Sequence, residues 1–401
     1  MPPSAHEWGP PDRRQLLFYT LMLMTFLAAS GVPTPLYQLY QESWHFSTPM
    51  LTLVFATYLF TLLVTLLFTG ALSDHLGRRP VILGGLVIQL LAMLCFLLAT
   101  DLGWLLAARA LQGVATGIVT SALGAALLDS DHQRGPLMAS VAPMLGMGLG
   151  VLGAGILVET APWPLHLIFA VMVLIYLWQT LGLREMKETV TRQPGALASM
   201  KPRVYVAPSV MPIFVRAMPA SIAAWALGGF TLSLGPALTE HIAATDSALV
   251  GALPASLLSV TGSLGVWRFR RFTTRTILLL SGTLLPTGLA IVLGGVQLHL
   301  IALLLIGYAV AGLGFGAGFM GAMRAIMPLA PAGQRSSLMA AFYVASYLSA
   351  SLPALAAGMA TQAVGLETTA RVYGLLVMLL SLSVPVSVLR RNPDAAAAPG
   401  H

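Results

Sequence analysis

The chain has 401 residues, of which 57% are hydrophobic and only 9% are charged, and its mean hydropathy is +0.83. Soluble domains contain about 25% charged residues, so this composition excludes a soluble globular protein and indicates a chain embedded in lipid. The net charge of +7 does not indicate nucleic-acid binding, because no soluble domain carries it. The single cysteine, Cys95, excludes an internal disulfide and a cysteine-based metal site. We therefore expect no metal and no cofactor.

Taken in chain order, twelve apolar segments are long enough to cross ~30 Å of hydrocarbon as helices. The first follows the pair Arg13-Arg14 and is too long for the core of a signal peptide, so we expect it to be an uncleaved helix. The sequence predicts an all-α membrane protein with helices at 16–39, 49–70, 80–100, 102–127, 137–158, 164–183, 212–238, 247–266, 276–296, 300–326, 337–362 and 369–389.

A polar stretch rich in Lys, Arg, Glu and Pro separates the sixth segment from the seventh. It predicts a linker between two six-helix halves. The expected organisation is an N-terminal tail at 1–15, a first bundle at 16–184, a central linker at 185–211, a second bundle at 212–389 and a C-terminal tail at 390–401.

The two halves contain matching sequences, which indicates an internal repeat. Gln133-Arg134 and Gln334-Arg335 are 201 residues apart, and the same offset places Gly113 and Gly117 on Gly314 and Gly318. An offset of 192 places Gly70 on Gly262 and the pair Arg78-Arg79 on Arg270-Arg271. These matches predict two pseudo-symmetric bundles, the plan of transporters whose halves rock around a site at the membrane midplane.

The basic residues lie almost entirely on one predicted side of the membrane. The exceptions are Arg109, inside the fourth segment, and Arg371, which Glu367 can pair with along its helix. Because basic loops remain in the cytoplasm, we expect both termini to be cytoplasmic and the protein to lie in a bacterial inner membrane. The 19 residues of this side are Arg13, Arg14, Arg78, Arg79, Arg134, Arg184, Lys187, Arg192, Lys201, Arg203, Arg216, Arg268, Arg270, Arg271, Arg275, Arg324, Arg335, Arg390 and Arg391.

The loop between the second and third segments reads Gly70-Ala-Leu-Ser-Asp74-His-Leu-Gly77-Arg78-Arg79-Pro80. Gly70 would let a neighbouring helix approach, and Asp74 can interact with a helix N-terminus. The two arginines can reach cytoplasmic carboxylates, and Asp129 is the expected partner of one of them. This stretch resembles the signature loop of the major facilitator superfamily.

The resemblance implies the fold of that superfamily and transport by alternating access. It also implies that Asp74 docks near Ser336 and Ser337, latching the two halves while the site faces outward. In the second half Val266 stands at the position matched to Asp74, so we expect an Asp-dependent latch on one side only. The expected latch residues are Gly70, Asp74, Gly77, Arg78, Arg79 and Asp129.

Two further stretches refine the resemblance. Leu105-Leu-Ala-Ala-Arg109-Ala-Leu-Gln112-Gly113-Val-Ala-Thr-Gly117 resembles the helix 4 motif of proton-linked members. The glycines of the fifth segment resemble the helix 5 motif of drug:proton antiporters, although Gly150-Val151 replaces its Gly-Pro. Small residues at this spacing also allow tight helix packing. We expect packing or hinge roles for Pro33, Pro35, Gly113, Gly117, Gly146, Gly150 and Gly153.

A charged residue within a span needs a partner or a function, and Arg109 has two alternatives. It can line a central cavity opposite the break at Pro33 and Pro35, whose missing N–H groups free carbonyls as acceptors. Alternatively, it snorkels outward or only braces helix 1. Tyr37 is interpreted as an interfacial residue. The candidates for the substrate cavity are Arg109, Gln112, Thr116, Tyr58, Trp225, Tyr308, Tyr343 and Tyr347.

None of the acidic residues falls deep in a predicted span, and Glu159, Glu240 and Glu367 lie at outer helix ends. No span contains a pairing of residues suited to catalysis, so we do not expect an enzyme. The most favoured function is a monomeric secondary transporter that exports drug-like or metabolite molecules in exchange for protons. The alternatives are an uptake symporter or uniporter for a small metabolite, which can be anionic, and a non-transporting sensor of transporter ancestry.

Overall fold

The computed structural model describes residues 12–331 and 334–389, and the described chain consists of helices and the loops that join them. The helices of the first half are α1 Arg13–Gly31, η1 Thr34–Leu36, α2 Tyr37–Trp44, α3 Thr48–Thr69, α4 Leu72–Leu76, α5 Arg78–Leu97, α6 Leu102–Ser130, α7 Gly135–Thr160 and α8 Leu167–Leu183. They are followed by α9 Ala196–Ser199, α10 Met211–Ser233, α11 Gly235–Ala243, α12 Ala248–Phe269, α13 Thr274–Leu298, α14 Ile301–Ile326, η2 Met327–Leu329, α15 Arg335–Val364 and α16 Leu366–Leu389.

The predicted spans match these helices, which confirms the all-α membrane fold. Span 16–39 covers α1, η1 and the start of α2, and span 212–238 covers α10 and the start of α11. Eleven of the matched helices, among the described residues, are long and apolar enough to cross a bilayer, and the twelfth, α8, is a shorter apolar helix. Their surfaces carry large exposed apolar side chains such as Leu181, Leu376 and Leu379, as expected of helices that face lipid.

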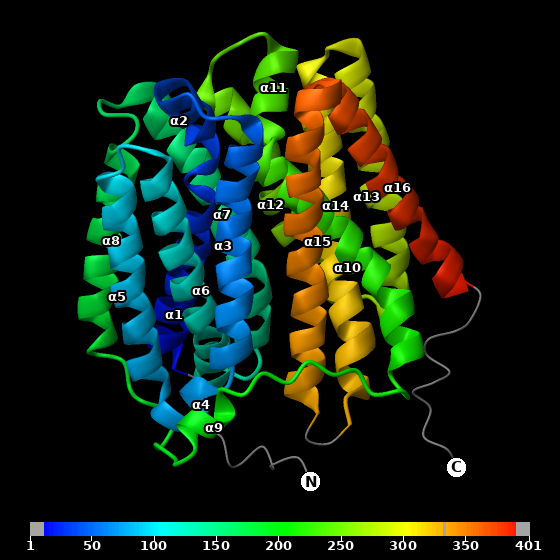
Figure 1. Ribbon diagram of the computed structural model, residues 1–401. Helices are drawn as coiled ribbons and strands as arrows, with labels where there is room; N and C mark the ends of the chain where they lie inside the picture. Colours follow the sequence, from blue (N-terminus) through cyan, green and yellow to red (C-terminus); the bar gives the residue numbers. More distant parts are fainter. Residues whose placement is uncertain (1–11, 332–333, 390–401) are drawn as a thin grey trace.

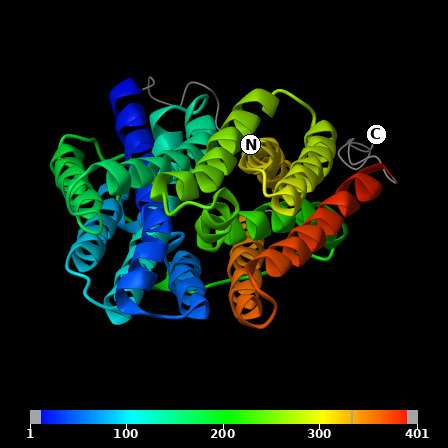
Figure 2. The same ribbon diagram turned by 90° about the horizontal axis from the view of Figure 1, so that it is seen from above.

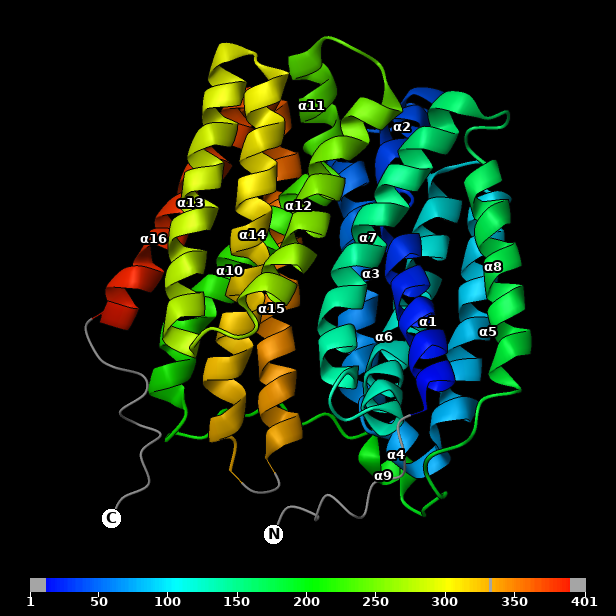
Figure 3. The same ribbon diagram turned by 180° about the vertical axis from the view of Figure 1, so that it is seen from behind.

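The helices form two bundles that lie side by side (Figures 1 and 2). One contains α1 to α8 and the other α10 to α16, and the segment between them crosses one end of the molecule past α9 and the end of α15 (Figure 3). We call this end, which carries Arg78, Arg270 and Arg335, the basic face, and the end near α2 and α11 the opposite face.

The first helix of each bundle is broken near the opposite face. In the first bundle α1 stops at Gly31, and η1 and α2 continue it; in the second, α10 stops at Ser233 and α11 continues it. Pro35 and Pro236, which lie at these breaks, are 201 residues apart. Because proline cannot donate to the preceding turn, both bundles begin with an interrupted helix.

The bundles touch closely at the opposite face. A Cβ atom added to Gly155 of α7 would lie 2.8 Å from the Cβ of Ala252 on α12. One added to Gly358 of α15 would lie 2.2 Å from Oγ1 of Thr52 on α3. The Ser247 hydroxyl also donates to Glu159 Oε2 over 2.9 Å. These contacts close the opposite face of the molecule.

The glycine pairing predicted at an offset of 201 is wrong in register. Cβ atoms added to Gly113 and Gly312 would each lie 1.9 Å from a threonine Oγ1, that of Thr61 and of Thr261 respectively. Gly314 instead packs on Leu285 of α13. The equivalent glycines are therefore 199 residues apart. The loop containing η2, between α14 and α15, is longer than the loop between α6 and α7, so residues after these loops match at the larger offset of 201.

The predicted second copy of the signature loop is also wrong. Gly262 and Val266 lie within α12, where Gly262 packs on Phe315 and Val266 is 1% exposed. Only residues 270–273 connect α12 to α13, whereas residues 70–77, including α4, connect α3 to α5. The signature loop and its short helix therefore occur in the first half alone.

The glycines of α7 serve two different contacts. Cβ atoms added to Gly146 and Gly150 would lie 2.2 and 2.3 Å from the carbonyl oxygens of Met24 and Ala28, so α7 packs tightly on α1. Gly148 meets α12 of the other bundle, as Gly155 does. Gly153 was expected in the same packing role, but a Cβ atom there would meet nothing within 4 Å.

Candidate functional site

A cavity of about 230 Å³ lies between the two bundles. Helices α1, α3, α6 and α7 of the first bundle and α10, α12, α14 and α15 of the second all contribute to its wall. Five of the predicted cavity residues line it: Tyr58, Thr116, Trp225, Tyr343 and Tyr347.

Aromatic side chains form one wall of this cavity. The rings of Trp225 and Tyr347 meet edge to face with centroids 4.8 Å apart, and Tyr343 stacks on Tyr347 at 5.9 Å. Phe319 contacts Trp225 at 6.1 Å. Among the described residues, the indole Nε1 of Trp225 has no acceptor. The wall thus offers mainly apolar ring surface.

The cavity lining is uncharged. Apart from the aromatic residues, its polar groups are hydroxyls, and no Asp, Glu, Lys or Arg from the described part of the chain contributes to it. The hydroxyl residues are Ser30, Thr116, Thr120, Ser140 and Ser259. A lining of rings, methyl groups and hydroxyls suits a compact apolar solute that makes few hydrogen bonds.

The cavity continues toward the basic face. A recess of about 450 Å³ at that end shares Ser140 and Phe319 with the cavity wall. Arg270, Arg271 and Arg324 line the recess. Since the opposite face is closed, the structure represents the conformation in which the cavity faces the basic face.

Arg109 is fully buried behind the cavity wall and does not line it. Its Nη1 donates to the Ser30 carbonyl over 2.9 Å and to Gln112 Oε1 over 2.7 Å, and its Nη2 donates to the Tyr37 hydroxyl. The guanidinium carbon also lies 5.4 Å from the ring centre of Tyr58. Arg109 therefore holds helix 1 at its break.

The break in helix 1 explains these contacts. Pro33 has no N–H to donate to the carbonyl of Ala29, and the end of α1 leaves the Ser30 carbonyl without a helical partner. Gln112 Nε2 donates to the Ala29 carbonyl over 2.9 Å, and Arg109 donates to that of Ser30. Of the two alternatives drawn from the sequence, these contacts favour the brace.

Two other candidates, Gln112 and Tyr308, lie away from the cavity. Gln112 is buried beside Arg109. Tyr308 is 1% exposed and packs in the core of the second bundle, near Leu289 and Val292. Tyr37, interpreted as an interfacial residue, is instead 1% exposed, because its hydroxyl accepts from Arg109 inside the bundle.

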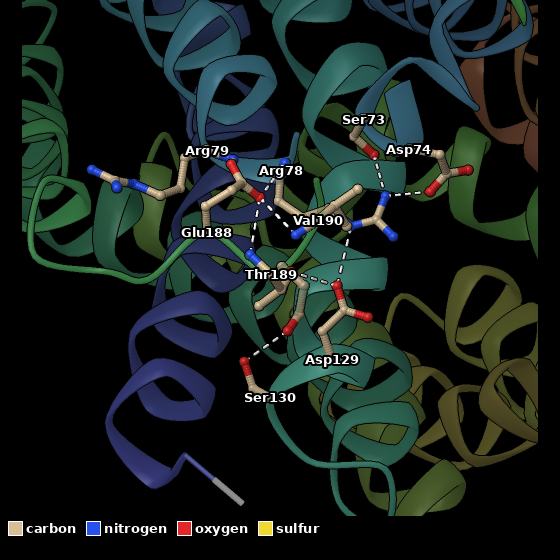
Figure 4. Close-up of polar contacts among 10 residues, drawn as sticks. Ser73, Asp74, Arg78, Arg79, Asp129, Ser130, Glu188, Thr189 and Val190 are labelled. Carbon is tan, nitrogen blue, oxygen red and sulfur yellow. Dashed lines mark hydrogen bonds and ion pairs between the residues drawn. The ribbon is translucent and has the colours of Figure 1, made fainter. Parts of the chain in front are cut away.

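The signature loop forms a polar cluster at the basic face (Figure 4). The buried side chain of Arg78 donates through Nε to Asp129 Oδ2 over 3.2 Å and through Nη1 to Ser73 Oγ over 2.8 Å. The same nitrogen pairs with Asp74. The expected partnership with Asp129 is therefore present, and Arg78 ties α4 to the ends of α5 and α6.

Sequence reasoning missed Glu188, a linker residue that completes this cluster. Its Oε1 and Oε2 accept from the backbone N–H groups of Arg78 and Arg79 over 2.8 and 2.9 Å (Figure 4). Those are the first two N–H groups of α5, where a carboxylate stabilises a helix by about 0.5–2 kcal/mol. Thr189 then donates to Asp129 Oδ2 over 2.7 Å.

Of the loop glycines, Gly77 has a clear structural requirement and Gly70 does not. Gly77 has φ of +94°, and a Cβ atom there would lie 2.7 Å from Glu188 Oε2. At Gly70 a Cβ atom would meet only the carbonyl of Leu66 in its own helix, so the neighbouring helix expected there is absent among the described residues.

Asp74 pairs with Arg78 and is largely exposed in this conformation. Among the described residues, it forms no hydrogen bond with Ser336 or Ser337. The resemblance implies the latch only for a state in which the basic face is closed. In the present conformation the linker backbone occupies the start of α15, because Tyr205 N donates to the Ser337 carbonyl over 3.4 Å.

Two helical bundles that enclose a cavity, closed at one face and open toward the other, define a membrane transporter. The family model of the Major Facilitator Superfamily matches residues 18–352. The chain belongs to this superfamily.

The relatives with similar sequences include proteins named for multidrug resistance. Multidrug resistance protein MdtL of Salmonella heidelberg (strain SL476) is 27% identical over 304 residues, which are 69% of this chain and 71% of that protein. Multidrug resistance protein D of Escherichia coli (strain K12) is 38% identical over 96 residues. The latter match spans only 24% of each protein.

Solved structures share the fold at low sequence identity. The peptide transporter POT, in a mutant form in complex with sulfate, has a TM-score of 0.75 and 15% identity. The match covers 96% of this chain and 95% of that one. This similarity supports the fold alone.

Proposed function

We propose that this transporter exports compact apolar compounds, neutral or anionic, across a bacterial inner membrane by alternating access in exchange for protons. The observation that carries the proposal is the uncharged aromatic cavity facing the basic face. The basic face is assigned to the cytoplasm, because arginine-rich loops remain on that side. Solutes would then enter the cavity from inside the cell.

The cavity chemistry supports a preference for solutes without positive charge. Moving a permanent ion of either sign from water into an uncharged site is costly, so the lining itself favours neutral solutes. At the entrance, Arg270, Arg271 and Arg324 would attract anions and repel cations. The names of the relatives, which refer to multidrug resistance, support export of drug-like compounds.

The second candidate is uptake or uniport of an anionic metabolite. The arginines of the recess favour it, since they would bind an anion at the basic face whichever direction transport takes. The aromatic lining farther inside the cavity supports the export of apolar compounds better.

Probes of one shape and different charge test the proposed selectivity. We expect purified protein to bind tetraphenylborate and neutral triphenylphosphine oxide, and to bind the tetraphenylphosphonium cation at least about tenfold more weakly. Quenching of tryptophan fluorescence, to which Trp225 in the cavity wall contributes, measures the binding. Tighter binding of the cation than of the anion would contradict selection by the arginines of the recess.

Flux across vesicle membranes tests direction and coupling. In proteoliposomes with inside-out protein and an acidic lumen, we expect accumulation of the neutral probe to exceed that in vesicles without a pH gradient. A protonophore should remove the difference. Equal uptake with and without the gradient would reject proton exchange, and movement only in the reverse direction would favour the uptake alternative.

A further inference from the structure

The opposite face contains a buried acidic residue that neither the cavity nor the signature loop involves. Glu240 of α11 is 7% exposed, and its Oε1 lies 2.3 Å from the position that a Cβ atom on Gly251 of α12 would take. Within the described part of the chain, no donor forms a hydrogen bond or an ion pair with its carboxyl group. A carboxyl group in this situation is stable when it carries a proton.

Glu240 lies where the two bundles meet. It borders a cavity of about 180 Å³ whose wall includes Gln38 and Glu42 of α2 in the first bundle and Asp246 of the second. Both halves therefore contribute acidic groups to one cavity at the closed face, where Glu42 and Asp246 are exposed and Glu240 is buried.

The charged groups that act on Glu240 are all acidic. Burial, followed by the nearby charges of Asp246, Glu42 and Glu159, raises the pKa of its carboxyl group from 4.5 to about 8. Three basic groups at this end contact Glu367 instead. His241 Nε2, His299 Nε2 and Arg371 Nη2 lie 3.1, 3.5 and 2.6 Å from its carboxylate oxygens. No neighbouring cation thus offsets a negative charge on Glu240.

We propose that Glu240 is a proton-binding site of the outer gate, and that its protonation holds the opposite face closed while the cavity faces the cytoplasm. When the bundles separate at this face, water enters between Glu240, Glu42 and Asp246, and the carboxyl group ionises. The ionised groups of the two bundles then repel one another, which keeps the outer face open.

The sign of the pH dependence follows from the proton affinities of the two states. The closed state binds the proton more tightly, since the open state exposes Glu240 to water and returns its pKa toward 4.5. Between pH 4.5 and about 8, closing takes up a proton. The ratio of closed to open molecules therefore falls as pH rises, by up to about tenfold per pH unit.

This inference goes beyond the proposed export, because it requires no solute and no fixed proton stoichiometry. The test uses full-length protein in liposomes, with Cys95→Ser so that only introduced cysteines carry spin labels. Labels at Ser43→Cys on α2 and Gln297→Cys on α13 place exposed reporters on the two bundles at the opposite face. Double electron–electron resonance measures the distance between them from pH 5 to pH 9.

We expect a short distance at low pH and a growing population of long distances as pH rises toward 8 and above. Glu240→Gln, which mimics the protonated group, should keep the short distance throughout. Asp101→Asn is the matched control, because it removes an exposed acid at the same face and keeps a residue that caps α6 equally well. It should leave the pH profile unchanged.

Glu42→Gln provides an independent check that does not alter Glu240. Removing one neighbouring negative charge lowers the pKa of Glu240 in the closed state and weakens the repulsion that opens the face. The closed population should therefore be larger at high pH, and the midpoint should move to higher pH. The proposal would be overturned if the distance distribution of the spin-labelled protein that keeps Glu240 and Glu42 did not change with pH. A Glu240→Gln protein that retains the original midpoint would also overturn it. Neither result would bear on the flux test, which measures solute movement.

Discussion

Replacing Arg109 with alanine is expected to destabilise the protein strongly and to leave the charge preference of the cavity unchanged. The substitution removes hydrogen bonds to the Ser30 carbonyl, Gln112 and Tyr37, all within the bundle. Hydrogen bonds from a charged donor contribute about 1.5–3 kcal/mol each, and the Ser30 carbonyl would remain buried without a partner. We expect the melting temperature in detergent to fall by roughly 10 °C or more.

Probe affinity, measured on the fraction of protein that remains folded, shows whether Arg109 only braces helix 1 or also binds solute. For Arg109→Ala we expect the ratio of tetraphenylborate to tetraphenylphosphonium affinity to stay within about threefold of the unmodified value. Arg371→Ala is the control, since that arginine pairs with Glu367 at a partly exposed site and should matter less. An unchanged melting temperature together with lost anion binding would assign Arg109 to the cavity instead.

Replacing Gly124 with tryptophan should abolish binding without unfolding the protein. Gly124 of α6 lines the cavity, and a Cβ atom there would meet nothing within 4 Å, so the indole can extend into the space a solute would occupy. We expect probe affinity to fall by about 100-fold or more. Glycine destabilises a helix interior by about 0.5–1 kcal/mol. Replacing it should therefore stabilise α6 and offset part of any strain that the tryptophan side chain introduces.

A second glycine in open surroundings provides the control for this substitution. A Cβ atom on Gly84 of α5 also meets nothing within 4 Å, but Gly84 is exposed on the outside of the bundle. Gly84→Trp should therefore bind the probes as the unmodified protein does. If both substitutions reduce affinity equally, the loss would reflect a general effect of a bulky residue rather than a filled cavity.

The sequence predicted the helices well because crossing a bilayer imposes a length and a composition that can be counted directly. It predicted the repeat in the wrong register, since the loops after α3 and α14 differ in length from their counterparts and a fixed offset cannot follow such changes. The side chains that surround a residue identify its equivalent better than a fixed offset does. Thr61 lies against Gly113 in the first bundle, and Thr261 lies against Gly312 in the second.

The sites were harder to predict, because burial depends on how distant segments meet. The spacing of Arg109 within its span cannot tell whether it faces the cavity or the broken helix behind it. Glu188 lies 110 residues from the helix it caps, in a linker without periodicity. Glu240 stands at a helix end, a position typical of exposed acids, and is buried where α11 packs on α12 beside α2 of the other bundle.

The uncharged cavity also has an electrical consequence. Because its wall contributes no compensating charge, the charge carried across the membrane in each cycle is that of the solute and of the protons exchanged for it. A neutral solute leaving as one proton enters moves one positive charge inward, and a monovalent anion moves two. The membrane potential would then drive export directly, by about 2.3 kcal/mol per charge for each 100 mV, and would favour anions over neutral solutes.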